Sequence, residues 1–141
     1  MTFTTSDFKS VWISDKLEDG AITFAEKFGE HLCDLQNGRP GRMAMTTSQI
    51  RNFFGEVKRI QARSQAQGFD KQRTSFLLIR PKLAYAEARV LAKTRESRIS
   101  VFRKVIEQAH SAVKTEEQFQ NFVDFLEATL AYHKSFGGRD Q

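Results

Sequence analysis

The chain has 141 residues, of which 40% are hydrophobic, and its formal net charge is +5. This length fits one domain with a substantial core, so we take residues 1–141 as a single domain. Two Pro and eight Gly exclude a collagen-like or low-complexity chain, and no apolar run reaches the ~18 residues of a membrane-spanning helix. We expect a cytoplasmic protein without a membrane partner, because the N-terminus lacks a secretion-signal pattern and the single Cys33 cannot form an internal disulfide.

The charge is distributed unevenly along the chain. Residues 1–38 hold three Lys against seven acids, and residues 105–141 hold three basic residues against six acids. Residues 39–104 hold sixteen Lys and Arg against four acids, which gives this segment a charge of +12. Such a concentration favours a polyanionic partner or a contact between basic and acidic parts of neighbouring copies.

The first third of the chain predicts an arm, a helix and a loop. Residues 1–15 are rich in aromatic and aliphatic side chains, so part of this N-terminal arm should pack on the rest of the protein. Apolar residues at helical spacing predict a helix from Asp19 to Leu35, with Asn37-Gly38 as its stop. Residues 37–45 contain Gly and Pro and should form a basic loop.

The segment from Thr46 to Arg63 carries the clearest helix signal. Thr46 and Gln49 form a capping box, with Met45 and Ile50 at the two positions of a hydrophobic staple. The apolar face consists of Ile50, Phe53, Phe54, Val57 and Ile60. The opposite face is cationic with two small residues in it: Arg51, Gly55, Lys58, Arg59, Ala62 and Arg63. Gln67-Gly68 is expected to end the helix in a left-handed cap.

The remaining segments also predict helices. Residues 71–79 form one, and Pro81 breaks or kinks the chain and opens another that runs to Leu91. A further helix spans residues 94–113, and a second capping box at Thr115 opens the last one. This last helix has an inner apolar stripe and a second stripe that either packs in the bundle or contacts another copy: Phe125, Thr129, Tyr132 and Phe136. The predicted fold is all-α, a compact bundle of about five helices.

The sequence shows no catalytic or metal-binding pattern. His31, His110 and His133 stand far apart, each without a nearby Cys or second His, so they are expected to be surface or packing residues. Cys33 has no neighbouring cation that would mark it as a nucleophile, and phosphate-binding glycine loops are missing. We therefore predict no enzyme activity, no metal and no cofactor.

Basic residues gather at three places. The first is the cationic face between Arg51 and Arg63, and the second surrounds Tyr85, with Arg80, Lys82 and Arg89 near it. Tyr85 either stacks on a base or, as is more usual in an alanine-rich face, belongs to the core. The third group is typical of a solvated helix face: Lys93, Arg95, Arg98, Arg103 and Lys104. Such cations favour contacts with phosphates. The resulting affinity for nucleic acid does not depend on the base sequence and decreases as the salt concentration rises.

Three motifs resemble a known family. The segments TTSQIRNFFGEVKRI, LLIRPKLAYAEAR and FLEATLAYHKSFGG, in this order within residues 44–138, look like the small subunit of the type III-A CRISPR–Cas effector, the Csm complex. The resemblance implies a non-catalytic five-helix protein, several copies of which stack into a short filament along the guide RNA–target RNA duplex. Its partners would be guide RNA, target RNA, the backbone and large subunits, and further copies of itself.

The resemblance also implies which cations face RNA. By match to the first two motifs, the RNA-binding residues are expected to be Arg51, Lys58, Arg59, Arg80, Lys82 and Arg89. In that family the backbone subunit cuts target RNA, and the large subunit cleaves DNA and makes cyclic oligoadenylate. This implies an antiviral ribonucleoprotein in which the present chain is structural.

Two other functions remain as alternatives. A helical DNA-binding transcriptional regulator would use residues 46–63 as a recognition helix, but it needs a preceding helix that ends three or four residues before Thr46. The expected helix ends near Gln36 instead, which argues against a helix-turn-helix. A protein–protein adaptor would show no affinity for nucleic acid even in an assembled complex.

Overall fold

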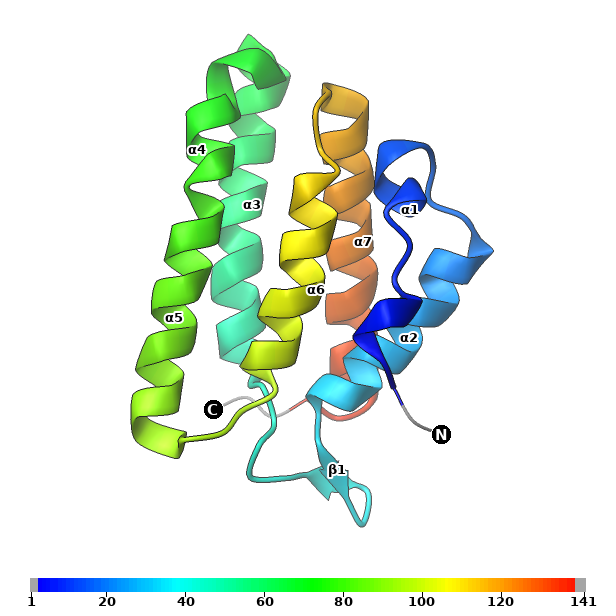
Figure 1. Cartoon of the computed structure of the whole chain (residues 1–141), viewed down its shortest axis with the longest axis vertical. Coiled ribbons are helices and arrows are strands. Elements are labelled where there is room, and N and C mark those ends of the chain that lie inside the picture. The colour runs from blue at the N-terminus through cyan, green and yellow to red at the C-terminus, as the bar shows by residue number, and fades with distance from the viewer. Residues whose placement is uncertain (1–2, 139–141) are drawn as a thin grey trace.

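The computed structural model describes residues 3–138, and within them the fold is a helical bundle, as predicted. Five α-helices are 13 to 21 residues long: α2 (Asp19–Leu32), α3 (Thr47–Gln67), α5 (Ile79–Thr94), α6 (Ile99–Ser111) and α7 (Glu116–Ser135). In Figure 1, α3 and α6 run upwards while α5 and α7 run downwards. No helix in the described part of the chain is long and apolar enough to cross a membrane.

The N-terminal arm packs on the bundle, as its apolar composition predicts. It contains the 3-10 helix η1 (Thr5–Asp7) and the short helix α1 (Val11–Ser14). Phe8 and Trp12 are buried, and Ile13 is completely inaccessible. Asn121 on α7 donates hydrogen bonds to the backbone carbonyls of Ile13 and Asp15, which ties the arm to the last helix. Residues 1 and 2 lie outside the description.

The prediction of a helix from Asp19 to Leu35 is wrong at its end. The helix stops at Leu32, and a two-stranded antiparallel hairpin follows, with β1 (Leu35–Gln36) paired to β2 (Arg39–Pro40). Asn37 and Gly38 both have positive φ, 54° and 77°, so they form the hairpin turn and are not a helix stop. Asn-Gly is the residue pair that such two-residue turns favour.

Helix α3 begins where the capping box predicts. The Thr46 hydroxyl accepts from Gln49 N at 3.1 Å, and the Gln49 side chain accepts from Thr46 N at 2.9 Å. Met45 and Ile50, the predicted staple residues, are both buried. The helix ends at Gln67, and Gly68 has φ 93° and ψ 148°, which is a positive-φ ending but lies outside the left-handed helical region.

The next two boundaries differ from the prediction. The 3-10 helix η2 (Phe69–Gln72) leads into α4 (Arg73–Leu77), and the break falls at Leu78, before Pro81 rather than at it. Pro81 lies in the first turn of α5, where its missing amide leaves no helical hydrogen bond unmade. The helix expected from residue 94 begins at Ile99, because Arg95 has φ 68° and ends α5.

Helix α7 opens with the predicted second capping box. The Thr115 hydroxyl accepts from Gln118 N at 3.2 Å, and the Gln118 side chain accepts from Thr115 N at 3.1 Å. Its second apolar stripe is only partly enclosed: Phe125 and Thr129 are completely buried, and Phe125 contacts the rings of Phe8 and Phe28, whereas Tyr132 and Phe136 are half-buried. Phe125 is therefore not available to another copy of the chain.

Helices α2 and α7 make the tightest contact of the bundle at Gly29. A Cβ atom placed on Gly29 would lie 2.8 Å from the backbone N of His133 and 2.9 Å from Cβ of Tyr132. Such distances leave no room for any side chain, so the two helix backbones touch at this point. By contrast, a Cβ atom placed on Gly55 of α3 would have only the tip of the Arg59 side chain within 4 Å, at 3.8 Å.

We therefore expect opposite effects from the same substitution at the two glycines. Gly29→Ala should lower the free energy of unfolding by about 1–3 kcal/mol, because α2 must move away from α7. Gly55→Ala should raise it by about 0.5–1 kcal/mol, because alanine has the higher helix propensity and meets open space. Urea unfolding followed by circular dichroism measures both. Equal effects at the two sites would contradict the close crossing.

Candidate nucleic-acid interface

The six cations proposed to face RNA are all exposed, but they lie in three groups. Lys82 and Arg89 line the space between α3 and α5, and Arg59 is linked to it through its ion pair with Glu56. Arg51 and Lys58 lie two turns apart on α3 and, at about 100° per residue, point away from the residues that line this space. Arg80 lies on the opposite side of α5 from Lys82 and Arg89, towards α6, where its charge adds to the effect of burial in lowering the pKa of His110.

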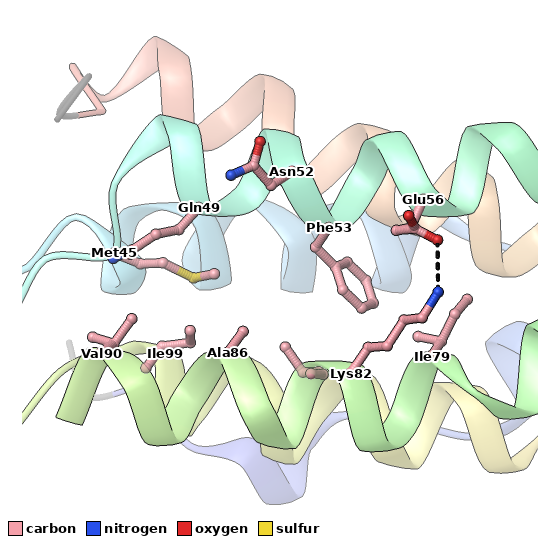
Figure 2. A pocket seen from close by; sticks show the side chains of 11 residues that line it. Met45, Gln49, Asn52, Phe53, Glu56, Ile79, Lys82, Ala86, Val90 and Ile99 are labelled. Atoms are coloured by element: carbon pink, nitrogen blue, oxygen red, sulfur yellow. Dashed lines mark hydrogen bonds and ion pairs between the residues drawn. The ribbon is translucent and has the colours of Figure 1, made fainter. Parts of the chain in front are cut away.

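An apolar groove separates the lower parts of α3 and α5. It encloses a cavity of about 210 Å³, with Phe53 on α3 facing Leu83, Ala86 and Val90 on α5. Figure 2 shows both helices from close by, with Phe53 directed from the upper helix, α3, towards the lower one, α5. The groove therefore has apolar side chains at its base and polar side chains along its rim.

Glu56 connects the two helices at one end of this groove. Its carboxylate accepts from Arg59 at 2.5 Å on α3 and from Lys82 at 3.3 Å on α5, the contact dashed in Figure 2. The hydrogen bond from Arg59, with the nearby Lys82, lowers the pKa of Glu56, so this carboxylate is ionised at neutral pH. The sequence interpretation missed Glu56, although its spacing of three residues from Arg59 pointed to an ion pair.

Tyr85 is a surface residue, so the interpretation that places it in the core is wrong. It is 65% exposed, and the Arg89 guanidinium lies 5.8 Å from its ring centre, one turn along α5. Arg89 also lines a shallow hollow together with Asn52 of α3 and Lys93. Lys58 makes the corresponding contact on α3, 5.7 Å from the ring of Phe54.

Two members of the third basic group hold the fold together. Arg98 donates to Asp34 at 3.0 Å and to His31 at 2.7 Å, and its backbone N donates to the Met43 carbonyl at 2.8 Å. Arg103 on α6 pairs with Glu87 on α5 and with Glu107. These two arginines are not a solvated face. The other three members of the group, Lys93, Arg95 and Lys104, are exposed.

The histidines are packing residues, as expected, and two of them are fully enclosed. His110 Nε2 donates to the Phe76 carbonyl at 2.7 Å, and its ring stacks on Phe76. His133 Nε2 donates to the Met45 carbonyl at 2.7 Å. Burial lowers the pKa of both, and burial together with Arg98 lowers the pKa of His31 to about 4.

The described residues contain no cluster of three or more His, Cys, Asp or Glu that could hold a metal ion. Cys33 is buried, and burial raises the pKa of its thiol to about 11. A thiol with such a pKa is almost entirely protonated at neutral pH and is a poor nucleophile.

The fold and this surface define a small helical protein with a cationic face. The family model described as Csm2 Type III-A matches residues 20–139, so the chain belongs to this family. It is also 26% identical over 117 residues to the "CRISPR system Cms protein Csm2" of Streptococcus thermophilus, covering 83% of this chain and 93% of that protein. No solved structure matches the chain. The predicted family resemblance is confirmed, and the chain is a subunit of a type III-A CRISPR effector.

The buried histidines predict that the protein loses stability on mild acidification. In the unfolded chain each histidine takes up a proton near pH 6.5, whereas the folded chain holds their pKa values lower. The unfolded state therefore binds more protons below pH 6.5, and the free energy of unfolding should fall between pH 6.5 and 5. Asp34 and Glu56 contribute only at lower pH, because their pKa values are also lowered.

Urea unfolding at several pH values between 7.5 and 5 measures this slope. A His110→Gln variant should be less stable at pH 7.5 but should show a shallower dependence on pH than wild type, since one titrating group is gone. Stability that stays constant or increases down to pH 5 would show that the histidines are accessible to protons in the folded chain.

Proposed function

We propose that this subunit is a non-catalytic, RNA-binding structural protein that contacts phosphates along the guide RNA–target RNA duplex. Several copies stack beside the backbone and large subunits of the effector. The six cations Arg51, Lys58, Arg59, Arg80, Lys82 and Arg89 contribute to RNA binding, with the group around the α3–α5 groove at its centre. The contacts read no base, so binding is indifferent to RNA sequence.

The observation that supports this proposal most directly is the arrangement of charges between α3 and α5. Lys82 and Arg89 of α5 line neighbouring parts of the space between the two helices, and Arg59 of α3 is linked to it through Glu56, the carboxylate already engaged by Arg59 and Lys82. The local charge is therefore positive even after the ion pairs are counted. Phosphates are attracted to such a surface by its charge, so binding does not require a precise geometric match between the protein and the RNA.

Changes of charge at the groove provide the test. Lys82→Ala and Arg89→Ala should each weaken RNA binding and flatten the slope of log K against log salt by roughly 0.7–0.9 per lost phosphate contact. Glu56→Gln should strengthen binding, because it releases Arg59 and Lys82 from a competing carboxylate. Salt titrations on two unrelated RNA sequences should give the same ranking for both.

Lys27→Ala is the matched control, because Lys27 is an exposed lysine on the acidic helix α2. It should leave affinity and salt slope as in wild type. If Lys82→Ala and Arg89→Ala behave like this control at every salt concentration, the groove is not an RNA-binding surface. A loss confined to one of the two RNA sequences would indicate base reading, which the proposal excludes.

Stacking of copies is the second part of the proposal. Exposed acids on α2, Asp19, Glu26 and Glu30, complement exposed cations that are not assigned to RNA, Arg95 and Lys104, so unlike surfaces of neighbouring copies attract each other. Such a head-to-tail contact extends without closing and therefore matches a linear RNA.

We expect the number of copies in the assembled effector to increase with the length of the guide RNA, because a longer duplex offers a longer track. Native mass spectrometry of complexes assembled on two guide lengths counts the copies. A single copy at both lengths would rule out stacking. The control is the number of large subunits, which should not change with guide length.

A further inference from the structure

The segment from the end of α4 into α5 carries apolar side chains that the bundle leaves uncovered. Among residues 3–138, the large hydrophobic side chains that stand exposed are Val11, Ile22, Leu77, Leu78 and Tyr85, of which Tyr85 is the most exposed at 65%. Three of these five fall within residues 77–85. Apolar side chains gathered in one exposed segment indicate an interaction site.

Tyr85 stands in a continuous row along α5. Leu78, Lys82, Tyr85 and Arg89 follow each other at spacings of four, three and four residues, so they lie on one side of the helix, and all four are exposed. The row runs beside the groove, since Lys82 reaches Glu56 on α3 and Arg89 lines the hollow next to Asn52. The row therefore alternates apolar and cationic side chains.

Arg89 holds the tyrosine ring in place. Its guanidinium lies 5.8 Å from the ring centre, a cation–π contact on one side of the ring, while most of the Tyr85 side chain stays exposed. A ring supported on one side and open to solvent is a flat surface on which another aromatic group can stack.

The charges around the row favour a polyanion as the group that covers it. Glu56 is already engaged by Arg59 and Lys82, and Glu87, which is 16% exposed, pairs with Arg103 on α6. Neither carboxylate competes for Arg89. An aromatic ring flanked by cations along one track is the arrangement by which proteins bind unpaired nucleic acid, with bases on the ring and phosphates on the cations.

We propose that Tyr85 stacks on an unpaired base of the bound RNA, while Lys82 and Arg89 hold the phosphates on either side of that nucleotide. This inference rests on the proposed function and adds a requirement to it. Bases inside a continuous duplex already stack on their neighbours, so the site takes a nucleotide that is single-stranded, bulged or terminal.

Binding of the full chain to two RNAs of equal length, a single strand and a perfect duplex, tests the proposal at low salt. Tyr85→Ala should lower the affinity for the single strand by about 5- to 150-fold, the range that alanine substitution gives for one base–aromatic stack. Tyr85→Phe should stay within about 2-fold of wild type, because the ring is kept. Neither variant should change the affinity for the duplex.

A second readout uses the assembled effector. Target RNAs that carry 5-iodouridine at one position in turn should cross-link to Tyr85 on irradiation, and only from positions left unpaired. Val11→Ala is the matched control, since Val11 is an exposed apolar residue on the N-terminal arm. It should match wild type in both experiments.

The remaining outcomes separate this proposal from the proposed function. If Lys82→Ala weakens RNA binding but Tyr85→Ala does not, stacking is wrong and the phosphate-binding surface stands. If neither variant changes RNA binding, both proposals fall. If Tyr85→Ala prevents co-purification with the other effector subunits at unchanged RNA affinity, the row binds protein, and the stacking proposal is overturned.

Discussion

The fold depends on the close crossing of α2 and α7 at Gly29. Because no side chain separates the two backbones there, His133 lies deep enough to donate its Nε2 hydrogen to the Met45 carbonyl. The Met45 amide in turn donates to the Leu32 carbonyl at the end of α2. Met45, the residue just before the Thr46 cap, is thus hydrogen-bonded through both its carbonyl and its amide. The contact between α2 and α7 therefore determines where α3 begins and where the cations on α3 lie.

This arrangement has an energetic cost that is visible at His133. The carbonyl of Met45 can only accept, so Nε2 carries the hydrogen, and Nδ1 is a buried acceptor without a hydrogen-bond partner. An unsatisfied buried polar atom costs about 1–3 kcal/mol. The fold tolerates this cost because the hydrogen bond from the same imidazole ring fixes the position of the Met45 carbonyl. A protonated ring would gain a donor there but would place a charge in the core, which is why burial lowers its pKa.

Features encoded by neighbouring residues could be predicted from the sequence, and features that depend on distant ones could not. Both capping boxes need only residues three apart, and both were predicted correctly. The Asn37-Gly38 pair is compatible with either a helix end or a hairpin turn. Which of the two forms depends on Asp34, whose carboxylate accepts hydrogen bonds from Met43 N and from Arg98. Arg98 was placed on a solvated face, because its partners lie more than sixty residues away. Charge distribution predicted a cationic surface, but not its division into three groups around α3 and α5.

The ion pairs of the groove are weak enough to leave the proposed RNA-binding surface available to phosphates. Lys82 and Glu56 are partly exposed, with side-chain exposures of 60% and 34%, and such pairs contribute about 0–1 kcal/mol in water. Lys82 can therefore leave Glu56 for a phosphate at little cost to the fold, while Arg59 keeps the carboxylate compensated. Arg98 differs, because its partner Asp34 is only 7% exposed, and removing Arg98 would leave a buried carboxylate without its ion-pair partner. In these two ion pairs, exposure of the carboxylate, rather than the cation itself, thus separates a lysine proposed to bind RNA from an arginine that holds the bundle together.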